Sequence, residues 1–338
     1  SHPFPTQVDT FTSRAFQVNC ATRRLGLDVN TQAEDFLLNG VLAKQNKGPL
    51  TPDNFPFKME YGYHFNSHLL GEFLAEHAIT QGVTLRQEHI VNVERSSDGN
   101  IAAVQTKAGE RIAGDFFVDC TGFKSLLLGE KLSIPFKDKS DTLFVDHAVA
   151  IQVPYEAQNA PIASHTISTA LKTGWGWAIG LKERRGIGHV YSSAYVSHDQ
   201  AEQELRDYIG PIAEQATSRL IPMNIGYREK FWHKNCVALG LAQGFVEPLE
   251  ATGLLVFDAT AKMLAEQFPS SKLDMPLIAK QFNQRVAISW DNVIDFVKAH
   301  YCLSKRDDSD FWLDNRAESS IPDSLKERLA RWKHQPPN

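Results

Sequence analysis

The chain has 338 residues, a formal net charge of −5, 42% hydrophobic residues and 22% charged residues. This composition is typical of a globular protein with one large core or two joined domains. It gives no electrostatic reason to expect nucleic acid or a membrane surface as a partner, no stretch approaches the roughly 18 apolar residues of a membrane span, and no signal peptide opens the chain.

Helices and loops are predicted for the first 55 residues, followed by a helix from Asn66 to about Gln81. Asn66 can cap this helix, and Gly82 can end it. Four short strands then follow, written VTLR, HIVNVER, IAAVQTK and DFFVDC, with the turns SSDGN and KAGE suited to hairpins. We expect a meander whose last, apolar strand enters a parallel sheet and stops at DCTG, where a tight turn near a ligand is needed.

Alternating β-branched and aromatic residues dominate the next part of the chain. The segments LFVDHAVAIQV, HTISTALKTGWGWAIGL and GIGHVYSSAYVS predict an antiparallel sheet that forms a second layer. A strand CVALG follows, then a loop, then a long buried helix from about Thr252 to Gln267. From residue 270 onward the pattern is helical.

The stretch GFVEPLEATGLLVF (residues 244–257) joins that strand to that helix. The first amides of a helix lack partners within it, and the positive end of the helix dipole favours an anion. Glu250 stands just before these amides. Two interpretations remain open: simple stabilisation of the helix start by an acidic residue, or a carboxylate set beside an anion site.

The stretch GWGWAIG (residues 174–180) places Trp175 and Trp177 on one face of a strand. Two core tryptophans are the commoner explanation of such a pattern. The same pair would also make a wall that shapes a reaction. His64, near the start of the predicted helix at Asn66, is more often a structural residue than a catalytic one.

Four cysteines lie far apart in the sequence, at positions 20, 120, 236 and 302. No pair has the close spacing of a zinc site or of a redox CxxC motif. We therefore expect buried, reduced thiols in a cytoplasmic protein, and no metal site.

Four segments together resemble the flavin-dependent halogenases of the tryptophan halogenase family. They are FFVDCTGFKSLLLGEKL (116–132), GWGWAIG (174–180), NCVALGLAQGFVEPLEATGLL (235–255) and DFVKAHYCLSKRDDSDFWLDNR (295–316). The likeness runs from about residue 60 to the end of the chain. The combination of GWxWxI with FVEPLEATG is highly specific to that family.

The resemblance implies an α/β (α+β) fold of the FAD-binding, aromatic-hydroxylase type. It predicts a mixed sheet, an antiparallel second sheet and a helical substrate layer. Residues 1–338 are interpreted as one halogenase-type domain. Within it, residues 60–135 and 235–268 form the flavin-binding part, residues 140–234 the antiparallel sheet, and residues 270–338 the helical part.

The resemblance also assigns roles to individual residues. Glu250 matches the active-site glutamate, and Thr252 and Gly253 match the halide site. The pair Trp175 and Trp177 would screen flavin from substrate. The positions expected to contact FAD are Ile90, Gly122, Leu241, Pro248 and Leu254.

The implied activity is halogenation of a small aromatic, indole-like molecule by reduced FAD, oxygen and either chloride or bromide. Such an enzyme would receive FADH2 from a separate flavin reductase, and a homodimer is one candidate for its assembly. Two alternatives stay open: an FAD monooxygenase on the same fold, and a scaffold fragment without activity. A halide requirement for product formation separates the first alternative from halogenation.

The sequence departs from the family pattern at four points. It contains no GxGxxG, and nothing in it matches the segment that carries the catalytic lysine. It also ends before the residues that hold the amino and carboxylate groups of tryptophan, which favours a substrate without those groups. Gly180 stands where a proline is usual, and Ala251 replaces a serine. We expect the first strand and its GxGxxG loop to lie upstream of Ser1, because a sheet without that strand would leave an unpaired edge.

Overall fold

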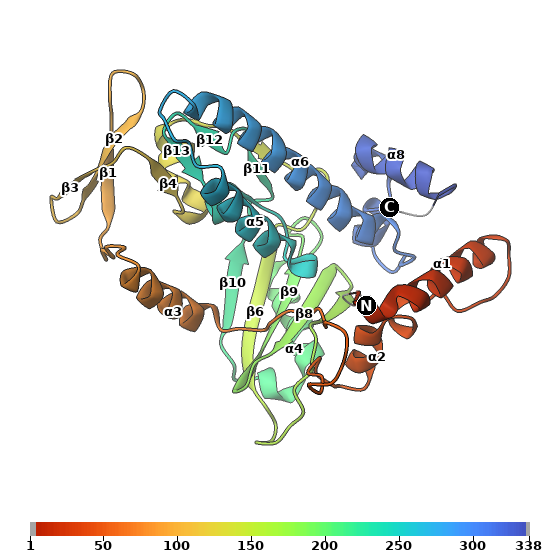
Figure 1. The fold of residues 1–338 in the computed structure, drawn as a ribbon. Coiled ribbons are helices and arrows are strands. Elements are labelled where there is room, and N and C mark those ends of the chain that lie inside the picture. The colour runs from red at the N-terminus through yellow and green to blue at the C-terminus, as the bar shows by residue number, and fades with distance from the viewer. Residues whose placement is uncertain (1–4, 336–338) are drawn as a thin grey trace.

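The computed structural model describes residues 5–335 (Figure 1). The helices are α1 (Thr10–Arg24), α2 (Leu38–Lys44), α3 (Ser67–Thr80), α4 (His198–Ile209), α5 (Thr252–Glu266), α6 (Met275–Cys302), α7 (Asp310–Asp314) and α8 (Asp323–Trp332). The strands are β1 (Ile90–Arg95), β2 (Ile101–Thr106), β3 (Arg111–Ala113), β4 (Phe117–Asp119), β5 (Phe136–Asp138), β6 (His147–Pro154), β7 (Ile167–Leu171), β8 (Gly174–Gly180), β9 (Arg184–Tyr191), β10 (Ser218–Pro222), β11 (Gly226–Arg228), β12 (Trp232–His233), β13 (Cys236–Ala238) and β14 (Gly244–Phe245).

The strands form a mixed α/β architecture, as the sequence predicted. The meander β1-β2-β3 projects from one end of the molecule, and the antiparallel sheet β10-β6-β9-β8-β7 makes a separate layer (Figure 1). Between them lie the small sheets β14-β11-β5 and β12-β13-β4. In the latter, β4 and β13 run parallel, which gives the molecule its mixed sheet. Helices α5 and α6 cross over these small sheets.

Alternation explains the antiparallel sheet. In β8, Trp175 lies opposite Val190 of β9, and Trp177 lies opposite Gly188. The indole of Trp177 covers Gly188 so closely that a Cβ built on this glycine would lie 2.1 Å from its Cζ2 atom. Only glycine therefore fits opposite Trp177.

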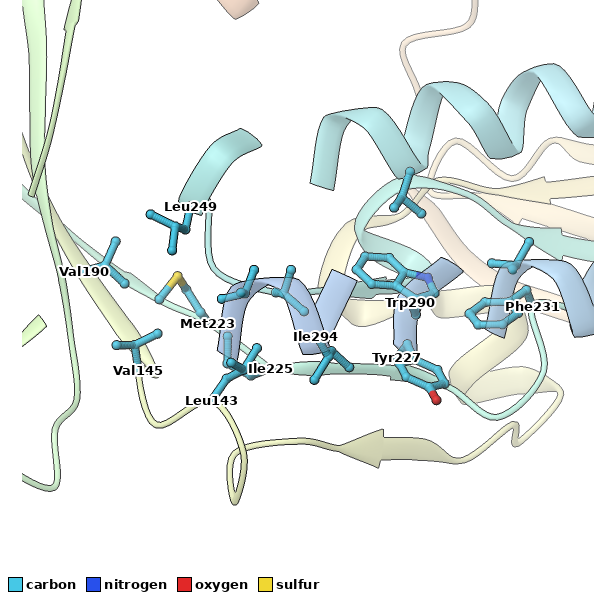
Figure 2. Packing of buried hydrophobic residues seen from close by; sticks show 14 of the residues in the cluster. Leu143, Val145, Val190, Met223, Ile225, Tyr227, Phe231, Leu249, Trp290 and Ile294 are labelled. Atoms are coloured by element: carbon cyan, nitrogen blue, oxygen red, sulfur yellow. The ribbon is translucent and has the colours of Figure 1, made fainter. Parts of the chain in front are cut away.

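The main hydrophobic core lies between α6 and the strands beneath it. Trp290 of α6 is fully buried, and its ring stacks on Tyr227 at a centroid distance of 6.3 Å. Phe231 lies in the same cluster (Figure 2). The cluster continues to Leu249 and Met223, so the segment before α5 is anchored in the core. Large aromatic side chains dominate the energetics of such a core because each buries about 150–250 Å².

Helix α3 begins where the sequence predicted. The Asn66 side chain accepts a hydrogen bond from the His68 backbone N–H at 3.0 Å, which is an N-cap. The helix ends at Thr80, and Gly82 follows with a φ of 90°. A positive φ at this position favours glycine, as the interpretation of Gly82 as a helix terminator requires.

Three expectations were wrong in part. The segment VTLR (83–86) is not a strand, because among the described residues no strand runs beside it. Helix α5 is buried on one face only, and Leu254 and Leu255 on its other face are exposed. Of the four cysteines, which form no disulfide, only Cys236 is buried, and Cys120 is exposed.

Within residues 5–335, no helix combines the length and apolar character needed to cross a membrane.

Candidate active site

The carboxyl ends of the parallel strands β4 and β13 define one side of the site. Each strand is followed by a short 3-10 turn, Gly122–Lys124 after β4 and Gly240–Ala242 after β13, and the two turns contact each other. Gly122 has a φ of 71°, and a Cβ built on it would meet no atom within 4 Å. Open space therefore borders the backbone where ligands of parallel α/β sheets bind.

Asp119, at the end of β4, holds the first of these turns. Its buried carboxylate accepts hydrogen bonds from the backbone N–H groups of Leu127 and Leu128 at 2.9 and 2.8 Å. It also accepts from the Thr121 hydroxyl at 2.6 Å. The buried acid is thus fully engaged in fixing the turn, and its role is structural.

Apolar side chains connect the two turns to the start of α5. The rings of Phe123 and Phe245 meet edge to face at 5.5 Å. A Cβ built on Gly253 would lie 4.0 Å from the Phe245 ring. Phe123 and Leu241 also line a cavity of about 280 Å³. The turns after β4 and β13 and the first turn of α5 therefore surround one region.

The backbone just before α5 is strained. Glu250 has φ 58° and ψ 17°, and Ala251 has φ 53° and ψ 25°, so two consecutive residues with side chains adopt the left-handed conformation. Each such residue costs about 1–2 kcal/mol. Strain of this kind persists only where the surroundings fix it, and it concentrates at functional sites.

The N-terminus of α5 has no side-chain cap. Its N-cap residue is Ala251, whose methyl group cannot accept a hydrogen bond from the first-turn amides. Thr252 and Gly253, which carry the first of these amides, are both buried. The first-turn amides of a helix and the positive end of its dipole favour an anion, and α5 has 15 residues. Glu250 directly precedes the N-cap residue Ala251, and its carboxylate lies 4.0 Å from Nε2 of His300.

The two tryptophans of β8 have different environments. Trp175 is only 5% exposed, and its Nε1–H donates to Oε2 of Glu247 at 2.6 Å. Trp177 is half-buried, and its ring centroid lies 6.2 Å from that of Trp175. Trp175 is therefore tied to the segment that precedes α5, and Trp177 is the one with surface left for a neighbour.

Glu247 is a fully buried acid that the sequence interpretation missed. Besides Trp175, it accepts a hydrogen bond from the Tyr301 hydroxyl of α6 at 2.5 Å, also on Oε2. Burial raises the pKa of Glu247 to about 7, although both hydrogen bonds and the nearby Lys298 oppose this shift. Burial also lowers the pKa of Lys298 to about 8. The Lys298 ammonium donates to Oδ1 of Asn315 at 2.9 Å.

The raised pKa of Glu247 predicts a pH-dependent stability. The folded carboxyl keeps its proton up to about pH 7, whereas the unfolded carboxyl releases it near 4.5. The contribution of this carboxyl to the free energy of unfolding is therefore fully present below pH 4.5. It is lost as the pH rises toward 7, at up to about 1.4 kcal/mol per pH unit. In Glu247→Gln this loss should be absent. Urea unfolding of both proteins at pH 5, 6 and 7 measures it.

The groups that face Glu247 are Trp175 from β8 and Tyr301 and Lys298 from α6. Tyr301 has a strongly raised pKa, and Lys298 titrates near pH 8, so both hold their protons over this pH range. The difference between the two proteins therefore isolates Glu247. An identical pH slope in wild type and Glu247→Gln would show that the carboxyl does not carry the dependence.

The predicted site residues fall into three places. Glu250, Thr252, Gly253 and Leu254 lie together at the start of α5, with exposed Pro248 just before them. Gly122 and Leu241 lie on the contacting turns after β4 and β13. Ile90, at the start of β1, packs against the separate cluster that includes Ala242.

Two further observations concern candidate ligands. Nδ1–H of His64 donates to the Gly180 carbonyl at 3.1 Å, and its Nε2 shares a hydrogen bond of 3.0 Å with the Thr166 hydroxyl, which supports a structural role for it. Among the described residues, no cluster of three or more histidine, cysteine or acidic side chains is placed to hold a metal ion.

The fold therefore combines a small mixed sheet, whose strand ends carry two contacting turns, with a separate antiparallel sheet and a strained turn before α5. In the comparison with known proteins, the family model for tryptophan halogenase matches residues 1–337. The chain therefore belongs to the tryptophan halogenase family.

Individual relatives agree. The chain is 40% identical over 278 residues to the tryptophan 6-halogenase of Streptomyces toxytricini, covering 82% of this chain and 53% of that protein. It is 34% identical over 290 residues to the tryptophan 7-halogenase of Lentzea aerocolonigenes, covering 86% and 54%. The crystal structure of a tryptophan halogenase from Shewanella frigidimarina superposes with a TM-score of 0.90 at 38% identity, covering 99% of this chain and 64% of that one. The chain thus spans about half the length of the curated relatives that it matches.

Proposed function

We propose that this chain carries the halide site and part of the flavin site of a flavin-dependent halogenase. The substrate would be an aromatic, indole-like small molecule, and the reaction would use reduced FAD, oxygen and chloride or bromide. The observation that carries the proposal is the strained pair Glu250 and Ala251. This pair directly precedes the buried N-terminus of α5, which has no side-chain cap, so an acidic residue stands two positions before the first residue of the helix.

The residues present fit a flavin. Gly122 leaves open space beside its backbone, which lets a planar ring system approach closely. Leu241 and Leu254 are 36% and 58% exposed, so they offer apolar surface to an isoalloxazine. Pro248 is exposed on the same loop as Glu250. Ile90 packs against the cluster that includes Ala242, and we propose that it contacts the adenine end.

Each group of residues at the site has its own role in the proposed reaction. In the proposed reaction oxygen is the oxidant: a bound reduced flavin would donate two of the four electrons that oxygen accepts and the halide the other two, giving hypohalous acid and water. The amides of Thr252 and Gly253 hold the halide before reaction. The Glu250 carboxylate holds or accepts a proton near the halogenating species, as a general acid–base group does. Trp177, with Trp175 behind it, separates flavin from substrate.

We further propose a separate flavin reductase as the source of FADH2, a cytoplasmic location and a homodimer as the possible assembly. The four unpaired thiols support a reducing compartment. The division into a flavin-binding part (60–135 and 235–268), an antiparallel sheet (140–234) and a helical part (270–338) belongs to the same proposal. The second edge of β4 has no strand partner among the described residues, which supports pairing with a further strand.

Mass spectrometry of indole incubated with the chain, FAD, a reductase system and bromide or chloride tests the function. We expect a product with the isotope pattern of the supplied halogen, and no such product without halide. Hydroxylated indole formed regardless of halide would instead establish an FAD monooxygenase. A chain that binds no flavin would support the scaffold alternative.

A further inference from the structure

Glu247 joins three elements that surround the candidate site. Its Oε2 atom accepts from Trp175 of β8 at 2.6 Å and from Tyr301 of α6 at 2.5 Å. These partners lie 72 and 54 residues away in the sequence. Glu247 is fully buried and stands three residues before Glu250. One side-chain oxygen therefore fixes the loop before α5 to both the antiparallel sheet and the longest helix.

The backbone that follows Glu247 needs such a fixed point. Two left-handed residues in sequence are unfavourable, so the turn relaxes unless both of its ends are held. Its downstream end is held by buried Thr252 at the start of α5. Its upstream end is held by the apolar contacts of Leu249, which points toward Met223 in the core (Figure 2). Hydrogen bonds depend on direction and apolar contacts do not, so the two short hydrogen bonds to the buried Glu247 carboxyl group restrain the turn more specifically than Leu249 does.

We propose that Glu247 is the positioning residue of the site: its hydrogen bonds to Trp175 and Tyr301 hold the strained turn that aims the Glu250 carboxylate and the first amides of α5. The effect on the turn follows from the geometry alone, and the effect on halide binding rests on the proposed function. Glu247 acts through other residues, since its own side chain is sealed in the core.

The hydrogen bond from Trp175 to Glu247 also fixes the Trp175 ring against the loop before α5. Trp175 is the inner member of the tryptophan pair, and Trp177 packs beside it. A shift of the loop would therefore move the tryptophan wall and the carboxylate together. Glu247 thereby couples the wall on β8 to the turn before α5.

Hydrogen–deuterium exchange of the full chain, followed by mass spectrometry of the peptide over residues 247–255, tests the proposal. Glu247→Ala should speed exchange in this peptide by about tenfold or more, because it removes two buried hydrogen bonds that hold the loop. Tyr301→Phe removes one donor, keeps the ring, and should give a smaller increase in the same peptide. Glu247→Gln keeps a side-chain oxygen that can accept the hydrogen bonds from Trp175 and Tyr301, so exchange in this variant should be as slow as in wild type.

A matched control is available on α6. Asp295 is another buried acid, and it accepts a hydrogen bond from the Ser324 hydroxyl at 2.9 Å. Asp295→Ala should destabilise its own surroundings and leave exchange over residues 247–255 unchanged. Unchanged exchange of this peptide in Glu247→Ala, or an increase spread equally over the chain, would overturn the positioning role.

Chloride binding, followed by the line width of the chloride NMR signal, separates this inference from the proposed function. We expect Glu247→Ala to lose the broadening that the wild-type chain causes, and Asp295→Ala to keep it. A wild-type chain that causes no broadening would overturn the proposed halide site. The exchange result would then still decide whether Glu247 holds the turn. Retained broadening in Glu247→Ala would overturn its link to halide binding.

Discussion

Replacing Glu250 with glutamine is expected to lower the halogenation rate by about 100-fold or more while the fold stays intact. The side chain is 30% exposed and lies 4.0 Å from Nε2 of His300, so its replacement by an amide of equal size leaves the core untouched. Glutamine also enters the left-handed backbone as readily as glutamate does. The change therefore removes the ionisable group alone. Steady-state rates with indole and saturating bromide measure its effect.

The opposite end of α5 provides the control. Glu266 is an exposed glutamate that pairs with Lys262 at 3.8 Å. Glu266→Gln should leave the halogenation rate unchanged, because exposed pairs of this kind contribute little. If Glu250→Gln kept the wild-type rate, Glu250 would have no part in the chemistry. An equal loss in both variants would point to an unspecific effect of charge on α5.

Local patterns were sufficient to predict much of the fold. The antiparallel sheet follows from alternation within single strands, and α3 follows from its cap at Asn66 and its end at Gly82. The strand, loop and helix around FVEPLEATG were also found from the sequence. These features depend on residues close together in the chain, which is why propensity and periodicity suffice for them.

The missed features depend on distant partners. VTLR has the composition of a strand, but a strand also needs a neighbour, and composition does not show whether one exists. The partners of Glu247 lie 54 and 72 residues away. One signal in the sequence was present: an acid placed directly after the apolar run GFV has to be paired if that run is buried. The strain at Glu250 and Ala251 had no such signal, because neither residue type favours a positive φ.

Replacing Gly253 with leucine is expected to abolish halide binding at the start of α5. The Cα–Cβ bond of a helical residue tilts toward the helix N-terminus, so a large side chain at this second position leans over the amides that face the anion. A Cβ at Gly253 would lie 3.9 Å from Phe257 and 4.0 Å from Phe245. These distances are ordinary contacts, and a leucine must extend past both rings. A chloride titration followed by NMR line width measures the loss.

Gly253→Ala is the matched variant, because its single methyl group fits the same space without a clash. Gly253 is helical, so alanine should keep or slightly raise the stability of α5, by less than about 1 kcal/mol. We expect it to retain measurable halide binding, which separates the bulk of the side chain from the mere loss of glycine. Halide affinity that is unchanged in the leucine variant would exclude the Thr252 and Gly253 amides as the site. The anion would then have to bind elsewhere, and Glu250 would lose the neighbour that its strained backbone is proposed to serve.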